Sequence, residues 1–185
     1  ANNPVMYYDP SGYARLCPGG KTDPSAITDG DDKIETRIIP GEEGVVTKGD
    51  SKKLGKNIME SMGQKRSRRW KGYQAQHVIP AQMSEHRVLQ KIGMDLNDAS
   101  NGLFLPVPED NVSALSRHSG YHSTYNKFVE MQLDAMDIGQ SSLYLQQQVL
   151  NLQNDLKKLL RSGLPLYPGQ GASIDLWQRS LGRIR

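Results

Sequence analysis

Residues 73–80, YQAQHVIP, decide the fold that we expect for this chain of 185 residues. The segment places His77 in a short apolar run that ends at Pro80, which predicts a buried strand terminated by the proline. Histidine is an unusual residue for such a strand, where Val, Ile and Leu are preferred. Either His77 is a hydrogen-bonded core residue, or the strand holds it at a reaction centre. The flanking sequence has to decide between these two interpretations.

Three elements are predicted downstream of this strand. Residues 82–93, QMSEHRVLQKIG, favour a short helix that ends at Gly93. Residues 96–101, LNDASN, contain the side chains that form turns, and residues 102–106, GLFLP, favour a second short strand. The second half of residues 107–136 is helical in pattern, because one set of residues recurs at steps of three and four: His122, Tyr125, Phe128, Val129 and Leu133.

A long helix is predicted over residues 141–162, and Gly163 and Pro165 end it. Its apolar stripe consists of Leu145, Val149, Leu152, Leu156 and Leu159. The same spacing is found in short coiled coils, but core packing is the preferred interpretation for a segment of this length. The end of the chain, DLWQRSLGRIR, is amphipathic.

Composition limits the kinds of site that the chain can build. A single cysteine, Cys17, excludes an intrachain disulfide framework and a zinc site made of several cysteines. Any metal must therefore be held by histidine, carboxylate or amide groups, and the chain has four histidines. No apolar run approaches the roughly 18 residues of a membrane span, and no signal-peptide pattern opens the chain. The net charge of +3 favours anionic partners mildly.

The segment 64–71, QKRSRRWK, carries five basic residues in eight. One interpretation is a solvated charge run. The other is a contact with nucleic acid, since lysine and arginine bind phosphates and the indole of Trp70 can stack on a base. Four arginines are weak candidates for contacting a substrate phosphate: Arg68, Arg69, Arg87 and Arg117.

The histidines carry the most specific signal. His118 and His122 are four residues apart, so on a helix both imidazoles lie on one face and are close enough to share a metal. Taken alone, such a pair is more often two surface histidines. With His77 on the first strand and Asn101 before the second, however, the order of elements is that of a ββα-metal site. We therefore expect an α+β fold with a small ββα-metal core, flanking helices and an irregular N-terminal arm.

Three segments, QHVIP, NDASNGLFLP and RHSGYHSTY, resemble the HNH/endonuclease VII superfamily, and specifically its AHH branch of bacterial toxin nucleases. The resemblance covers about residues 73–136. It implies that His77 is the general base, that Asn101 is the structural asparagine of the loop, and that His118 and His122 are metal ligands.

The remaining family ligand precedes the base and is usually His or Asp, but this chain has Gln76 there. The resemblance implies one divalent metal ion and leaves Mg²⁺, Zn²⁺, Ni²⁺ and Mn²⁺ open. An amide oxygen is a poorer zinc ligand than imidazole, although it suits a hard cation such as Mg²⁺.

The opening residues, NNPVMYYDPSGY, resemble the end of an Rhs-repeat core, where a variable C-terminal toxin begins. Asp9, Pro10 and Gly12 belong to the matching residues, and Tyr13 stands where leucine is usual. In that family the core cuts itself near this junction. The chain starts with alanine, so we expect it to be a piece of a longer protein.

Together the two resemblances imply a metal-dependent endonuclease toxin that hydrolyses DNA, with RNA as the less preferred substrate. Its expected partners are a cognate immunity protein, an Rhs carrier shell and a secretion apparatus that delivers it into the cytoplasm of competitor bacteria. The expected segments are a junction over 1–13, an irregular lead-in over 14–63, the nuclease core over 64–136 and a helical extension over 137–185. Two other interpretations stay open. One is a non-catalytic, metal-stabilised module that binds nucleic acid, and the other is a helical interaction domain at residues 141–162.

Overall fold

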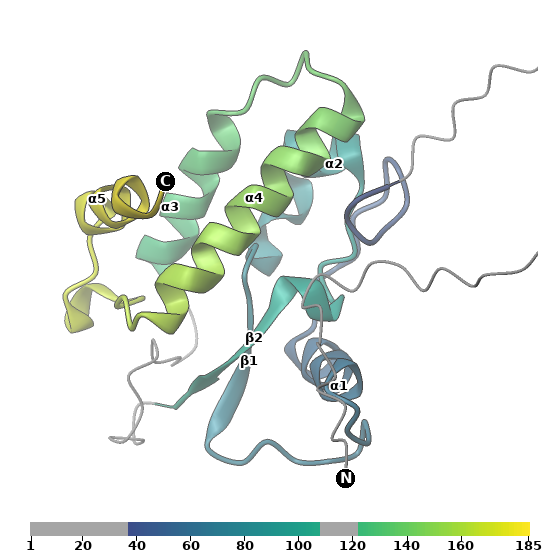
Figure 1. The fold of residues 1–185 in the computed structure, drawn as a ribbon, viewed down its shortest axis with the longest axis vertical. Coiled ribbons are helices and arrows are strands. Elements are labelled where there is room, and N and C mark those ends of the chain that lie inside the picture. The colour runs from purple at the N-terminus through teal and green to yellow at the C-terminus, as the bar shows by residue number, and fades with distance from the viewer. Residues whose placement is uncertain (1–36, 108–121) are drawn as a thin grey trace, which may run out of the picture. The chain divides into compact units, whose positions relative to one another are not determined.

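The computed structural model describes residues 37–107 and 122–185 (Figure 1). This part of the chain is α+β, as the sequence predicts. In chain order its elements are α1 (Ser51–Ser61), β1 (Tyr73–His77), the 3-10 helix η1 (Ala81–Glu85), α2 (Arg87–Ile92), the 3-10 helix η2 (Ala99–Asn101), β2 (Gly102–Pro106), α3 (Ser123–Asp134), α4 (Ser142–Arg161), the 3-10 helix η3 (Pro168–Gln170) and α5 (Ile174–Ile184).

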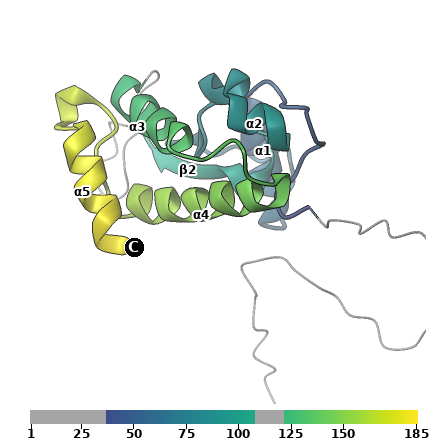
Figure 2. The ribbon, with the colours of Figure 1, turned by 90° about the horizontal axis from the view of Figure 1, so that it is seen from above.

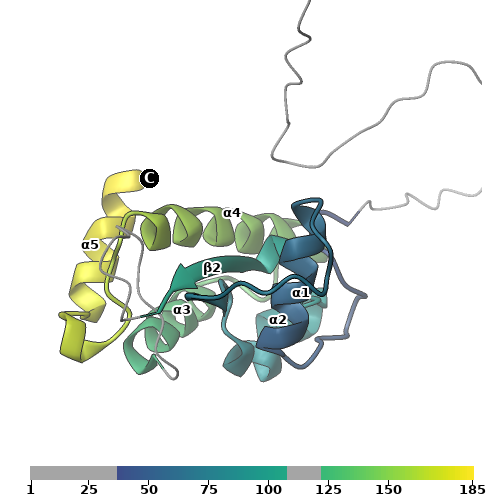
Figure 3. The same cartoon turned by 90° about the horizontal axis from the view of Figure 1, so that it is seen from below.

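The two strands form one antiparallel hairpin in which Tyr73 pairs with Pro106 and His77 with Gly102. The second strand has the predicted bounds. The first ends at His77, three residues earlier than predicted, because the backbone of Ile79 pairs with the side chain of Asn101 and with no neighbouring strand. Strand β2 lies between α3 and α4, as the views from above and below show (Figures 2 and 3), and α1 packs against the hairpin.

The main core is built mostly by α2, α3, α4 and α5. The predicted stripe of α4 is buried along its whole length, and it packs in the same cluster as Trp177 of α5. The ring of Trp177 packs edge-on against Tyr125 and at a tilt against Phe128, both on α3, with centroid distances of 5.0 Å and 5.4 Å. The stripe is therefore core, which was the preferred interpretation. Within the residues described, no helix is long and apolar enough to cross a membrane.

The lead-in expected over residues 14–63 contains an ordered helix in its last part. Helix α1 begins after Asp50, whose side chain accepts hydrogen bonds from the backbone N–H groups of Lys52 and Lys53. On its inner face, Leu54 and Ile58 form a small second core with Ala75 of β1. Leu54 and Ile58 are four residues apart and share one helix face, so α1 is amphipathic. Lys52, Lys53 and Lys56 make this pattern hard to recognise in the sequence.

Two predicted helices start or divide differently in the structure. The helix expected over 82–93 is split into η1 and α2 at His86, whose side chain caps α2 by accepting a hydrogen bond from Val88 N–H. The helix expected to carry both His118 and His122 begins at Ser123, so His122 is its N-cap residue with φ −116° and ψ 78°. His118 lies outside the described residues. The prediction that one helix face presents both imidazoles was therefore wrong for His122.

Candidate active site

His77 stands at the end of β1 with 6% of its surface exposed. Its Nε2 lies 3.3 Å from Oδ1 of Asn97. Two backbone contacts fix the orientation of that amide: Nδ2 donates to Lys48 O at 2.8 Å, and Oδ1 accepts from Asp50 N at 2.6 Å. Because an oxygen faces the ring, His77 Nε2 is the donor and carries the proton. The lone pair of the neutral imidazole is therefore on Nδ1.

The environment of His77 favours this neutral form. Burial lowers the pKa of His77 below the usual 6.5, and the hydrogen bond to Asn97 and the charge of Asp50 oppose that shift only in part. A neutral imidazole near pH 7 with one free lone pair is what a general base requires. From the sequence, Asn97 is predicted only as a turn residue, and no local pattern indicates its contact with His77.

We expect a histidine titration of the metal-free protein, followed by NMR, to give a midpoint below 6.5 for His77. Replacing Asn97 by aspartate puts a negative charge beside the ring, which favours the imidazolium form and raises the midpoint. The resonance of His86 is the internal control, because His86 contacts Asp134 and Val88 and not Asn97. An unchanged His77 midpoint in Asn97→Asp would show that Asn97 does not contact the ring in solution.

Asn101 is fully buried and ties the end of the strand to its surroundings. Its Oδ1 accepts from Ile79 N at 2.8 Å and from Gln153 Nε2 of α4 at 3.0 Å. Its Nδ2 donates to Ile79 O at 3.1 Å and to Leu96 O at 3.0 Å. Since Ile79 follows His77 by two residues, Asn101 holds the backbone that carries the histidine and has no exposed atom that could touch a substrate.

Gln76, the residue before His77 on β1, contacts His122 at the start of α3. The Gln76 Nε2 donates to His77 O at 2.8 Å, so its Oε1 faces His122 Nε2, at a distance of 2.9 Å. On the far side of the ring, Nδ1 lies 2.8 Å from Asn126 Oδ1. His122 is 6% exposed, and burial lowers its pKa.

This pair fits the requirements of a bound cation. With its oxygen toward the ring, Asn126 accepts a hydrogen bond from Nδ1–H, as carbonyl groups do behind metal-bound histidines. The Nε2 lone pair and Gln76 Oε1 can then both coordinate one cation. With the ring proton on Nε2, the same contact is a hydrogen bond to Gln76 Oε1, so the pair can hold an ion but does not require one.

Other candidate residues lie elsewhere or outside the described part. Among residues 37–107 and 122–185, no group of three or more His, Cys, Asp or Glu could hold a metal, so a third ligand has to come from another residue type or from outside these ranges. Arg87 is exposed in the first turn of α2, and Arg68 and Arg69 are exposed in the loop before β1. Arg117 and the junction residues Asp9, Pro10 and Gly12 lie outside the described residues, as His118 does.

A family model described as a nuclease family of the HNH/ENDO VII superfamily with conserved AHH matches residues 57–160. The chain belongs to this AHH nuclease family. Comparison with curated proteins and comparison with solved structures each gave no match.

The conserved motif of the AHH family locates the unusual residue of this chain. Within the matched range, Ala75-Gln76-His77 differs from Ala-His-His at one position. We propose that this tripeptide is the family motif, which would put its second histidine at His77 and glutamine in place of the first. Gln76 is also the residue whose side-chain oxygen faces His122.

Restoring the motif gives a direct test of this position. We expect Gln76→His in this AHH nuclease to raise the affinity for Zn²⁺ or Ni²⁺ by roughly tenfold or more, because imidazole is the better ligand for these ions. Isothermal titration of the metal-free protein measures the change. Gln178→His, at an exposed position of α5, is the matched control and should leave the affinity unchanged. Equal affinities for Gln76→His and the wild type would mean that residue 76 does not face the ion.

Proposed function

We propose that this AHH nuclease is a metal-dependent endonuclease that hydrolyses the phosphodiester bonds of DNA. The observation that supports it best is the state of His77, a buried and neutral imidazole whose amide partner fixes the proton on Nε2. Its free Nδ1 can take a proton from an attacking water. The pair formed by Gln76 and His122 comes from the neighbouring strand residue and the start of α3.

Each group of the chain has a defined part in the proposed reaction. Gln76 and His122, with His118 from outside the described residues, would hold one divalent metal ion, which would stabilise the charge that develops on the phosphate oxygens. Asn97 keeps the proton on Nε2 of His77, and Asn101 holds the backbone in place. None of these groups requires a 2′-hydroxyl on the substrate, so DNA suffices.

The biological setting is a further part of the proposal. We infer a toxin of interbacterial competition, carried at the end of an Rhs-repeat protein, delivered into the cytoplasm of target cells and neutralised in the producer by an immunity protein. The support is the resemblance of residues 1–13 to an Rhs junction, together with membership of the AHH nuclease family. Toxicity on expression in bacteria, relieved by co-expression of a neighbouring gene product, is the expected observation.

A plasmid-nicking assay tests the activity. Purified protein is first treated with EDTA, and Mg²⁺, Mn²⁺, Ni²⁺ or Zn²⁺ is then added back to separate samples, with RNA of matched length as a parallel substrate. We expect nicking of DNA with at least one of these metals and none in EDTA. Cleavage of RNA alone would identify RNA, and not DNA, as the substrate. A folded, metal-loaded protein that cuts neither would contradict the proposed activity.

One observation favours a second function. The amide of Gln76 in place of an imidazole is compatible with a metal site that only stabilises the fold, in a module that binds nucleic acid without cutting it. Metal content does not separate the two functions, because both bind an ion. Multiple turnovers of nicking by a limiting amount of protein separate them, since a binding module gives none.

A further inference from the structure

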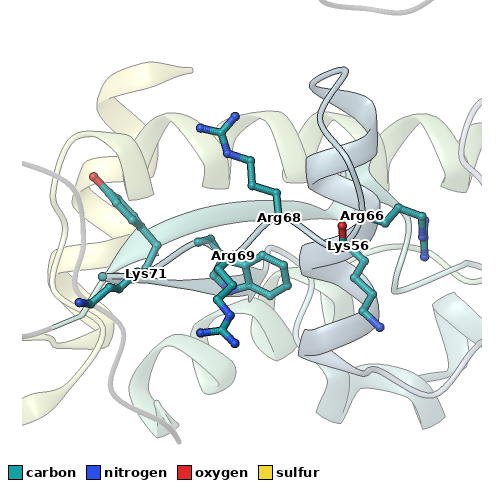
Figure 4. Close-up of a pocket in the computed structure, with 9 residues that line it drawn as sticks. Lys56, Arg66, Arg68, Arg69 and Lys71 are labelled. Carbon is teal, nitrogen blue, oxygen red and sulfur yellow. The ribbon is translucent and has the colours of Figure 1, made fainter.

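A basic hollow of about 370 Å³ lies between α1 and the loop that leads into β1 (Figure 4). We call it the basic bay. Its lining contains five lysines and arginines: Lys56, Arg66, Arg68, Arg69 and Lys71. Trp70 and Tyr73 contribute the aromatic part of the lining.

The bay is a built structure, which distinguishes it from a solvated charge run. The indole of Trp70 is half-buried against Phe104 of β2, with ring centroids 5.4 Å apart. It lies so close to α1 that a Cβ on Gly55 would stand 2.5 Å from the ring. Backbone hydrogen bonds from Arg68 N to Lys65 O and from Tyr73 N to Trp70 O fold the loop on both sides of this anchor. Trp70 therefore fixes the loop, and base stacking is not its main role.

The cations of the bay are only partly neutralised. Arg66 is bonded to Glu60 and Asn57, and Arg68 is bonded to the amide of Gln64. Within the described ranges, Lys56, Arg69 and Lys71 have no carboxylate partner, and all three are exposed. Lys56 and Arg69 extend to the same side of the loop, whereas Arg68 extends to the opposite side (Figure 4). Lys56 and Arg69 can therefore contact one phosphate chain together, whereas Arg68 lies on the other side of the loop.

Two elements lead from the bay to His77. Strand β1 begins at Tyr73, in the lining of the bay, and ends at His77, a distance of about 13 Å at 3.3–3.4 Å per residue. Helix α1 carries Lys56 at the bay, exposed Lys52 and Lys53 in its first turn, and at its start Asp50, whose N–H is bonded to Asn97. The bay and the base histidine are therefore about 13 Å apart along β1.

We propose that the basic bay binds the phosphodiester backbone that flanks the scissile bond, about 13 Å from His77 along β1. This inference rests on the proposed function only in so far as the substrate is a nucleic acid. The ligands are phosphates and the contacts are lysine and arginine side chains, so binding in the bay is independent of base sequence.

The test measures binding without cleavage. In a His77→Ala background, the triple substitution Lys56→Gln, Arg69→Gln and Lys71→Gln is compared with Lys158→Gln, Arg179→Gln and Arg183→Gln, which removes the same charge from exposed positions of α4 and α5. Fluorescence anisotropy of labelled duplex DNA, single-stranded DNA and RNA of equal length gives Kd over a range of salt concentrations. Thermal unfolding verifies that both triple variants are folded.

We expect the bay variant to bind at least about tenfold more weakly near 0.1 M salt. Its plot of log Kd against log salt should be less steep by about 1 for each cation removed. The control variant should keep most of the wild-type slope. In the otherwise wild-type protein, the bay substitutions should raise KM for cleavage and change kcat little.

The outcomes separate this inference from the proposed function. A bay variant that binds every nucleic acid with the affinity and slope of its parent overturns the inference, even if the wild type cuts DNA. A bay variant that loses affinity and slope supports it, even if the wild type fails to cut. The affinity for duplex DNA, single-stranded DNA and RNA is compared between the bay variant and its parent. The nucleic acid whose affinity falls most is the form that occupies the bay.

Discussion

Plasmid nicking by His77→Ala should be slower than nicking by the wild type by a factor of about 10²–10⁴, the usual contribution of a general base. The substitution removes Nδ1, the only free lone pair of the buried ring, and leaves Gln76 and His122 in place. Metal affinity, measured by isothermal titration, should therefore stay close to that of the wild type. The combination of lost turnover and retained metal separates a base from a ligand.

The matched control is His86→Ala. His86 is also mostly buried and hydrogen-bonded, since its Nε2 lies 3.1 Å from Asp134 and its side chain caps α2. Losing a helix cap costs about 1 kcal/mol of stability, so the control protein stays folded and its nicking rate should be close to that of the wild type. A His77→Ala protein with the wild-type rate would place the base on another residue and remove the main support for the proposed mechanism.

The part of the site that the sequence predicts is local in the chain. The bounds of β2 follow from Gly102 and Pro106, because these residues punctuate strands. The helix stripe of α4 follows from its own spacing. The placement of His77 on a buried strand follows from eight consecutive residues, 73–80, although the strand ends at His77 and not at Pro80.

The part that the sequence does not predict depends on distant contacts. Asn97 orients His77 only because Lys48 O and Asp50 N lie beside it, and these groups are 49 and 47 residues away in the chain. The segment that supplies them looks irregular in the sequence, so no pattern shows what it contacts. The spacing of the histidines also cannot locate the start of α3 after His122. His118 and His122 are four residues apart in the sequence whether or not both lie within the helix.

We expect Asn101→Ala to be the most destabilising single substitution in the site, by about 3–5 kcal/mol. The side chain satisfies the N–H and C=O of Ile79, the C=O of Leu96 and the amide of Gln153, and all three partners are buried. Each buried polar group left without a partner costs about 1–3 kcal/mol. In a domain of this size the melting temperature should fall by about 2–4 °C for each kcal/mol, as calorimetry would measure.

Two further variants separate the hydrogen bonds of Asn101 from general effects of substitution. Asn154→Ala, at an exposed position of α4, removes the same side chain and should leave the melting temperature within about 2 °C of the wild type, because surface substitutions change stability by less than about 0.5 kcal/mol. Asn101→Asp keeps the oxygen that accepts from Ile79 and Gln153 but sets a second oxygen against the carbonyls of Ile79 and Leu96. It should therefore be destabilised as well, although it preserves the volume of the side chain. If Asn101→Asp were as stable as the wild type, the two donor contacts would contribute nothing, and Asn101 would hold the His77 backbone through its oxygen alone.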